Sequence, residues 1–220
     1  VDVATVDEAG PKLEAFKAAG AKHINIQLCD HDTEIRKAVP VARAVMQAGK
    51  ELKLMPAIEW HRDTCTETPE KGLALAEQYE KRYKEKLRTN FDHSHPAIIK
   101  QLRPNTFWER IAEYRLDLLQ MSEMIHFRTF TGSHCQTPVT NGRGKLDGDF
   151  VSWRDNFLKH ALYNWVQGQR GAKELWAVVE LGPLGSGYAL ECFPDVWKDA
   201  IVARGEIEKA FKGALRKAGK

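Results

Sequence analysis

Residues 53–59 read Lys53-Leu-Met-Pro-Ala-Ile-Glu59, a short and mostly apolar run that ends on a carboxylate. A loop follows, and then Thr68-Pro69-Glu70 combines a capping hydroxyl, a proline suited to the first helical position and an acidic residue near the positive end of the helix dipole. The stretch therefore predicts a strand and then a helix that extends to about Lys84. Pro56 cannot donate a hydrogen bond to a neighbouring strand, which counts against the strand.

The same order of elements recurs along the whole chain. The predicted strands cover 23–29, 53–59, 87–92, 124–128 and 174–180. The predicted helices cover Pro11 to Ala19, Thr33 to Gln47, 68–84, 96–102, 106–119, 150–166 and a last segment that begins at Asp195, with Gly20 and Gly49 as the stops of the first two. This alternation is typical of βα units around a parallel sheet. Because no linker or low-complexity segment interrupts it, we expect residues 1–220 to form a single α/β domain.

Composition and charge exclude several classes of protein. The chain has 220 residues, of which 43% are apolar and 29% charged, so it can bury a substantial core. Its 33 basic and 30 acidic residues leave a net charge of +3, short of the strongly basic balance of nucleic-acid binders. No run approaches the ~20 apolar residues of a membrane span, and the N-terminal residues lack the layout of a signal peptide. We expect a cytoplasmic protein with no nucleic-acid or membrane partner.

Four cysteines are spread widely along the chain. They are Cys29, Cys65, Cys135 and Cys192, and they form no CxxC pair. Their number is also too low for a disulfide scaffold. We interpret them as reduced thiols.

Four of the five predicted strands carry a potential metal ligand at or near their C-terminal end. These residues are Glu59, Asp92, His126 and Glu180. Ligands of parallel α/β folds bind at this edge of the sheet, where the strand ends converge. Three carboxylates and one imidazole suit a single divalent ion such as Mn²⁺, Mg²⁺, Co²⁺ or Zn²⁺. A lone strand-end carboxylate is more often a cap or an ion-pair partner, so it is the coincidence of four that predicts a metal site.

Other ionisable residues leave alternatives open at this edge. The carboxylates could instead pair with arginines, for which the candidates are Arg62, Arg128 and Arg204. His95 follows Asp92 by three residues, which predicts that both face the same opening, although the pair could equally cap the next helix. His61, just beyond Glu59, is either a substrate contact or solvated.

The segment from Thr129 to Asp149 contains four glycines and is too long for a simple connector. We predict a mobile lid that closes over the site and excludes water, with His134 or Arg143 reaching the substrate. Cys135 beside His134 could suggest a thiol–imidazole nucleophile. Adjacent residues in an extended segment point to opposite sides, however, which disfavours that pairing.

Five motifs make the chain resemble the xylose-isomerase-like sugar phosphate isomerase/epimerase family. They are Ile58-Glu-Trp-His-Arg-Asp-Thr64, Asn90-Phe-Asp-His-Ser-His95, Ile125-His-Phe-Arg128, Asn141-Gly-Arg-Gly-Lys-Leu146 and Val179-Glu-Leu-Gly182. The resemblance covers roughly residues 12 to 205. It implies a (β/α)₈ TIM barrel with one divalent metal ion held by the four strand-end residues. It also implies that the two glutamates act as acid and base on opposite faces of the substrate, and that His95 contacts substrate oxygens.

The chain departs from this family in two respects. A substrate arginine follows the metal histidine by several residues in the epimerases, whereas the sixth residue after His126 is Gly132; Arg128 and Arg143 are the available substitutes. The chain also supplies five predicted strands where the barrel has eight, so we expect it to lack the first strands, since the segment before Pro11 has room for one short strand at most. Either the natural protein is longer, or a second copy of the chain covers the gap.

The resemblance and the ligand set together predict an enzyme. We expect a metal-dependent isomerase or epimerase of a keto sugar, in which Glu59 or Glu180 removes a proton next to a carbonyl group and the resulting enediolate is stabilised by the cation. One alternative is a lyase that performs β-elimination on a 3-keto glycoside. Another is a non-catalytic barrel subunit that needs a partner. An apurinic endonuclease is disfavoured, because the Asp-x-His pair of those enzymes is absent before the glycine loop.

Overall fold

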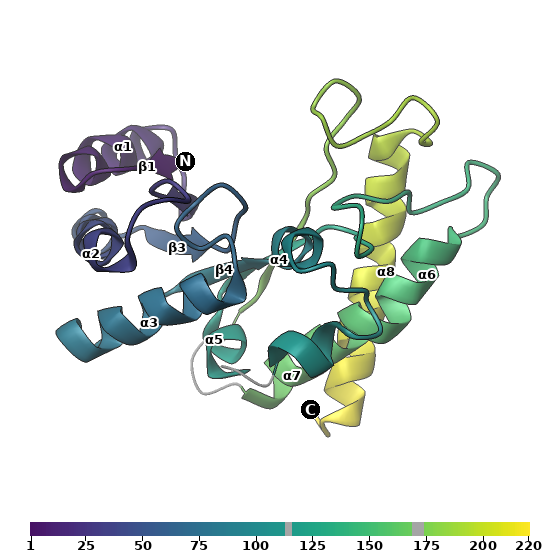
Figure 1. The fold of residues 1–220 in the computed structure, drawn as a ribbon. Helices are drawn as coiled ribbons and strands as arrows, with labels where there is room; N and C mark the ends of the chain where they lie inside the picture. Colours follow the sequence, from purple (N-terminus) through teal and green to yellow (C-terminus); the bar gives the residue numbers. More distant parts are fainter. Residues whose placement is uncertain (113–115, 169–173) are drawn as a thin grey trace.

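Six parallel strands form one sheet in the computed structural model, which describes residues 1–112, 116–168 and 174–220 (Figure 1). The strands are β1 (Asp2–Val3), β2 (His23–Leu28), β3 (Met55–Glu59), β4 (Thr89–Asp92), β5 (Met124–Phe127) and β6 (Trp176–Val179). They lie in chain order, and each neighbouring pair is parallel. Consecutive βα units give this order, so the predicted α/β architecture is confirmed.

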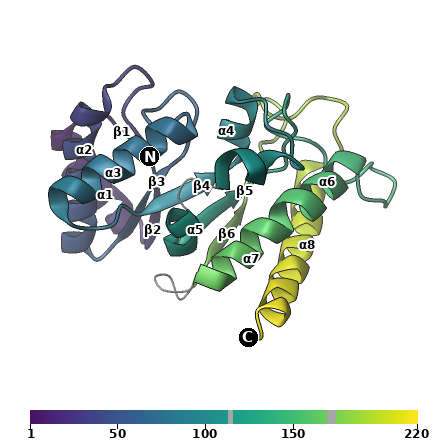
Figure 2. The ribbon, with the colours of Figure 1, turned by 60° about the horizontal axis from the view of Figure 1, so that its bottom comes forward.

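Helices connect the strands and cover the sheet. They are α1 (Val6–Ala18), α2 (Ile35–Leu52), α3 (Pro69–Tyr83), α4 (Ser94–Ile99), α5 (Leu116–Met121), α6 (Gly148–Trp153), α7 (Lys159–Gly168) and α8 (Val196–Lys217). Helices α1, α2 and α3 lie side by side around the N-terminal strands, and α7 and α8 pack together near β6 (Figures 1 and 2). None of the described helices has the length and apolar character that crossing a membrane requires.

The sheet is strongly curved. The ring of His23, at the start of β2, lies 4.1 Å from the ring of Trp176, at the start of β6, although three strands separate β2 from β6. Only a sheet that curls toward closure brings such positions together. The curvature also directs the C-terminal ends of the strands toward a common opening.

Buried apolar and half-buried polar residues alternate along β2, so one face of the strand packs in the hydrophobic core and the other lines the concave side of the sheet. Ile24, Ile26 and Leu28 are buried within the hydrophobic core, whereas Asn25 and Gln27 between them are half-buried. Successive side chains of a strand point to opposite faces, so the polar pair lines the concave side of the curved sheet. The concave side is therefore polar near the strand ends.

All five predicted strands are present, within two residues at each end, and β1 is an additional strand. It consists of two residues, with Asp2 opposite Gln27 and Val3 opposite Leu28. Two residues are too few to show a period-2 pattern, which explains why the sequence pattern did not indicate this strand.

Two predicted helix ends are wrong. Helix α1 begins at Val6 and includes Pro11, which we expected to begin the helix. Helix α2 continues past Gly49 to Leu52 and ends on Lys53 in the left-handed conformation. Gly49 has another role, because a Cβ atom there would lie 2.5 Å from the ring of Pro56. This glycine permits close contact between the helix and β3, while Gly20, with φ of +85°, follows the end of α1 as predicted.

Two further predicted helices are divided. The segment 150–166 consists of α6, a π-helical turn at Arg154–Leu158 and α7. The segment 106–119 contains a π-helical turn at Trp108–Ala112 and part of α5. Its residues 113–115 lie outside the described part of the chain.

Candidate metal centre

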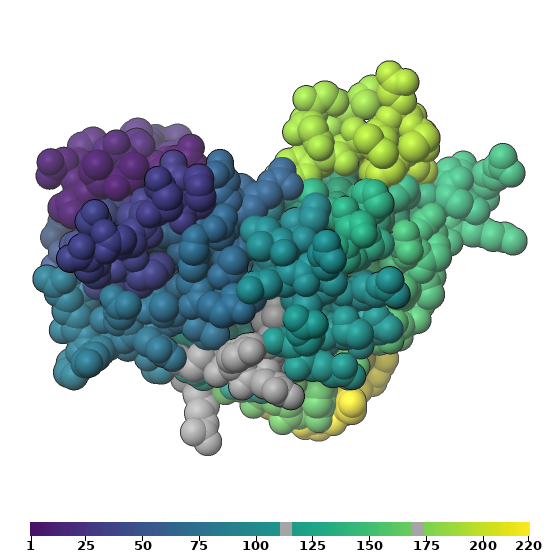
Figure 3. Space-filling model, in the orientation of Figure 1, coloured from purple at the N-terminus to yellow at the C-terminus, as the bar shows by residue number. Residues whose placement is uncertain are grey.

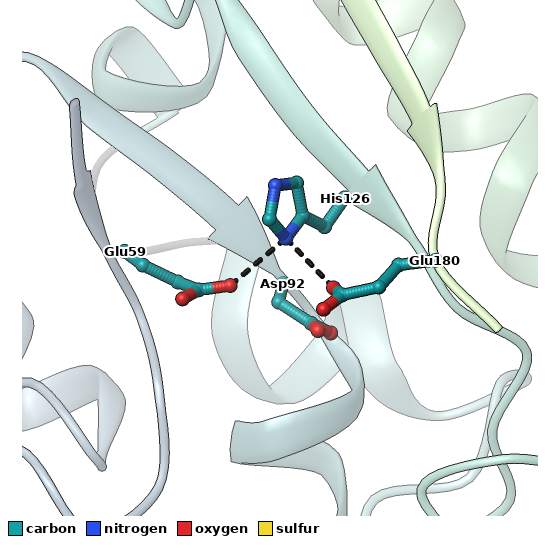
Figure 4. Close-up of side chains that lie close together, drawn as sticks. All are labelled: Glu59, Asp92, His126 and Glu180. Carbon is teal, nitrogen blue, oxygen red and sulfur yellow. Dashed lines mark ion pairs between the residues drawn. The ribbon is translucent and has the colours of Figure 1, made fainter. Parts of the chain in front are cut away.

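The four strand-end residues predicted as metal ligands lie together. Glu59 is the last residue of β3, Asp92 ends β4, His126 lies in β5, and Glu180 directly follows β6. One potential ligand atom from each side chain lies within 4.8 Å of the other three (Figure 4). The register explains the convergence, because Asp92 pairs directly with His126 across the β4–β5 ladder and the neighbouring strands end at the same edge.

Three of these atoms form two close ion pairs whose geometry is not that of a hydrogen bond. His126 Nδ1 lies 2.9 Å from Glu59 Oε1 and 2.7 Å from Glu180 Oε2 (Figure 4). All three atoms are buried and have no hydrogen-bond partner in the described residues. Buried polar atoms of proteins nearly always have a partner. A cation between the two carboxylate oxygens and the imidazole nitrogen would satisfy all three, so the donor set fits a metal ion.

The local charge also suits a divalent cation. Three carboxylates face one buried guanidinium, that of Arg128, so these four groups carry a net formal charge of two minus before His126 is counted. Burial alone would lower the pKa of His126, but the adjacent carboxylates of Glu180 and Glu59 outweigh it and raise that pKa to about 10. The site thus strongly favours positive charge at its centre.

Asp92 is fully buried, and its two oxygens have different partners. Oδ1 accepts hydrogen bonds from the backbone N–H and the hydroxyl of Ser94, at 2.9 and 2.6 Å. Oδ2 lies 3.3 Å from both His95 Nε2 and Arg128 Nε. Burial would raise the pKa of Asp92, yet the charges of His95 and Arg128 hold it well below its usual range. Asp92 is therefore held as a carboxylate.

One arginine does pair with the site's carboxylates, which was the alternative that the sequence left open. Arg128 is buried, and its Nη2 lies 2.8 Å from Glu180 Oε1, while its Nε faces Asp92. Arg204 pairs instead with Glu208 on α8, and Arg62 donates to the sulfur of Cys135. Arg128 occupies one oxygen of Glu180 and leaves the other directed at His126.

An amide chain that the motifs did not indicate orients Glu59. The side-chain amide of Asn25 donates to Glu59 Oε2 at 2.6 Å, and that of Gln27 approaches the same oxygen at 3.3 Å. Asn90 in turn donates to Asn25 Oδ1 at 2.7 Å. These contacts hold Oε2 and aim Oε1 at His126. The sequence did contain a signal for these amides, because the polar residues Asn25 and Gln27 alternate with the apolar residues of β2.

Aromatic and basic side chains border the opening beside the four ligands. The rings of His61 and His95 are 3.9 Å apart, which places both predicted substrate contacts next to Asp92. The ring of Tyr188 lies under two guanidinium groups, 4.0 Å from Arg128 and 4.9 Å from Arg62. Tyr188 belongs to the loop after β6, which projects as a separate lobe across a notch from the N-terminal elements (Figure 3).

Two of the five predicted substrate contacts, His134 and Arg143, lie elsewhere. His134 is exposed and lines a separate hollow of about 530 Å³ with Arg103 and Asp149. Arg143 is exposed in the turn at the tip of the long loop. Neither has a hydrogen bond or ion pair to the four ligands among the described residues, so a substrate role for them remains a prediction that requires movement of the loop.

Buried contacts attach the base of this loop to the rest of the molecule. The carboxylate of Asp199, on α8, accepts hydrogen bonds from the backbone N–H of Val139 and from the backbone N–H and hydroxyl of Thr140. Gln136 exchanges two hydrogen bonds with the backbone of Gly182. Any closing movement is therefore confined to the exposed part of the segment, and the predicted lid remains a prediction.

Comparison with known proteins identifies the fold. No protein-family model matches the chain, and a search of curated proteins finds no match either. Among solved structures, an L-ribulose 3-epimerase matches with a TM-score of 0.57 and 15% identity, over 97% of this chain and 69% of that one. A D-tagatose 3-epimerase-like protein matches with a TM-score of 0.56 and 11% identity, over 97% and 70%. An IOLI protein with a bound zinc atom matches with a TM-score of 0.47 and 12% identity, over 96% and 69%.

Two of these likenesses exceed a TM-score of 0.5 and extend over nearly the whole chain. Both solved structures are longer than this chain, which agrees with a sheet of six described strands where a complete barrel of this type has eight. The chain therefore shares the TIM-barrel type of fold that its sequence motifs imply, with six of the eight strands in the described residues.

Proposed function

We propose that this protein binds one divalent metal ion through Glu59, Asp92, His126 and Glu180 and catalyses the isomerisation or epimerisation of a keto sugar. The observation that carries the proposal is the convergence of Glu59 Oε1, His126 Nδ1 and Glu180 Oε2, three buried atoms without hydrogen bonds. A divalent cation held there would stabilise the negative charge that develops on a substrate oxygen when a neighbouring C–H bond loses its proton.

The two glutamates are differently placed for moving that proton. The side chain of Glu180 is 35% exposed and borders the opening, so a substrate carbon can approach its carboxylate. Glu59 is buried, and one of its oxygens is held by Asn25 and Gln27. We assign the first proton removal to Glu180 on this ground. Glu59 is then the group that returns a proton from the opposite face in an epimerisation.

The surrounding side chains bind and orient the substrate in this proposal. His95 is fully buried; its Nε2 faces Asp92 Oδ2 at 3.3 Å, and its Nδ1 has no partner in the described residues, which leaves Nδ1 for a substrate hydroxyl. The ring of His61 packs against that of His95 at a tilted angle and supports its orientation. Tyr188, beneath Arg128, adds a wall that limits the access of water to the reacting carbon.

Solvent deuterium exchange tests the reaction across many candidate sugars at once. The metal-loaded protein is incubated in D₂O with a panel of free and phosphorylated ketoses and with a 3-keto glycoside, and the products are followed by NMR. An isomerase or epimerase incorporates deuterium at the carbon next to the carbonyl group and produces the epimer or the aldose. Release of the aglycone from the glycoside would establish the lyase instead. No metal uptake and no exchange with any substrate would contradict the proposal.

A further inference from the structure

Two cysteines that are 36 positions apart in the sequence lie against each other in the structure. Cys29 directly follows β2, and Cys65 lies in the loop after β3. The backbone N–H of Cys65 donates to the carbonyl of Leu28 at 3.1 Å, which places the two segments side by side. Cys65 is also the neighbour with the largest effect on the pKa of the Cys29 thiol, while the Cys29 S–H donates to the carbonyl of Ala4 at 3.6 Å. Neither thiol takes part in the proposed metal chemistry.

The two thiols differ in access to solvent. Cys65 is completely buried, whereas Cys29 is half-buried and lines a hollow of about 280 Å³ together with Gln27, His61 and Arg62. The neighbouring Cys65 thiol lowers the pKa of the Cys29 thiol against the opposing effect of burial. The same contact and burial raise the pKa of the Cys65 thiol. Cys29 is therefore the accessible nucleophile, and Cys65 is the neighbour that can resolve an adduct formed on it.

We propose that Cys29 and Cys65 are a redox-active pair that forms a reversible disulfide by exchange with a low-molecular-weight disulfide such as oxidised glutathione. In the first step, the Cys29 thiolate attacks one glutathione sulfur, forms a mixed disulfide and releases one reduced glutathione. In the second, the Cys65 thiol loses its proton and attacks the Cys29 sulfur, which expels the second reduced glutathione. The protein loses two electrons and two protons, and the glutathione disulfide gains them.

The position of the pair connects this disulfide to the metal centre. A bond between residues 29 and 65 would join the end of β2 to the loop that carries His61 and Arg62. That loop is attached to Glu59, because the hydroxyl of Thr66 donates to the Glu59 carbonyl at 2.6 Å. The modification would therefore fix the rim of the opening in one arrangement. The inference does not depend on the proposed catalytic function.

The test uses a background in which Cys135→Ser and Cys192→Ser leave only the pair. The folded, reduced protein is treated with oxidised glutathione, denatured, alkylated with iodoacetamide and analysed by mass spectrometry. We expect the loss of two hydrogen masses, no alkylation, a linked peptide that contains Cys29 and Cys65, and full reversal by dithiothreitol. We also expect the oxidised form to melt at a higher temperature, because the bond restricts the unfolded chain.

Two single variants in the same background separate the roles. Cys65→Ser should accumulate a lasting glutathione adduct on Cys29, since no resolving thiol remains. Cys29→Ser should remain unmodified while folded, because Cys65 is buried, and should react only after denaturation. Circular dichroism and thermal melting confirm that each variant is folded. A persistent adduct on Cys29 when Cys65 is present, or no reaction of the folded pair, would overturn the proposal.

Discussion

Glu180 is the proposed ligand with two competing partners, and it offers the sharpest test of the proposed metal centre. One of its oxygens faces His126 at 2.7 Å and the other contacts Arg128 at 2.8 Å. Glu180→Gln keeps the size of the side chain but removes one of the three carboxylate charges. We expect metal affinity to fall by at least the ~10–100-fold that is typical when a supporting group of a metal site is lost. Isothermal titration with Mn²⁺, Co²⁺ and Zn²⁺ measures the change.

The matched control for this variant is Glu191→Gln, which changes an exposed glutamate in the loop after β6. We expect its metal affinity and turnover to equal those of the unmodified protein. Metal content and turnover near normal in Glu180→Gln would remove Glu180 from the centre.

Asn25 acts on the centre through Glu59, so its effect should appear in metal binding. Its amide holds Glu59 Oε2 at 2.6 Å and is itself held by Asn90. In Asn25→Ala we expect Glu59 to lose this orientation and the affinity for the metal to fall by about 10-fold or more. Titration calorimetry against Asn156→Ala, which changes an exposed asparagine far along the chain, provides the comparison. Equal affinities in the two variants would show that Gln27 alone suffices to orient Glu59.

Helix α3 packs closely against Trp60, the residue after β3, and Gly72 makes this close contact possible. A Cβ atom on Gly72 would lie 2.8 Å from Cε2 of the Trp60 indole, which is itself buried. We expect Gly72→Ala to reduce the free energy of unfolding by about 1–3 kcal/mol, because the indole must move in a filled core. Urea unfolding measures the change.

Gly205→Ala in α8 is the control for this prediction, since nothing lies within 4 Å of the added methyl group. There we expect stabilisation of about 0.5–1 kcal/mol from the better helix propensity of alanine. The opposite signs of the two changes separate the packing constraint at Gly72 from the general cost of glycine in a helix. Stabilisation in both variants would contradict the role assigned to Gly72.

At the scale of the whole molecule, a bound ion would connect four consecutive strands. Its ligands come from β3, β4, β5 and the residue after β6, so unfolding any of these strands would release the ion. A ligand at 100 times its Kd stabilises the folded state by about 2.7 kcal/mol. For a chain of 220 residues this corresponds to a rise of roughly 5–10 °C in Tm.

Differential scanning calorimetry with added metal and with EDTA measures this shift. The difference between the two conditions should shrink or vanish in Glu180→Gln, because that variant binds the ion weakly. An unchanged Tm on removal of the metal from the unmodified protein would contradict a centre shared by these strands.

Local sequence patterns were enough to predict the βα alternation, the five longer strands and the four candidate ligands at strand ends. These features follow from local causes. Period-2 and helical periodicity need only neighbouring residues, and parallel strands in chain order place their C-terminal ends at one edge. The motif of Asp92 and His95 is also local, and the structure places both residues at the same opening. The start of α1 was missed because Pro11 suits the first helical position, although Thr5 and Glu8 have the spacing of a capping box and Asp7 and Glu8 place two acidic residues in the first turn.

The contacts between side chains of different strands and loops could not be predicted from the sequence and are seen in the folded chain. The pairing of Arg128 with Asp92 and Glu180, the amide chain from Asn90 to Glu59 and the contact between Cys29 and Cys65 each join segments far apart in the sequence. Their partners depend on the curvature of the sheet and the path of each loop, and no spacing rule describes either. Sequence periodicity shows which way a residue faces, but its partner depends on the packing of the whole chain.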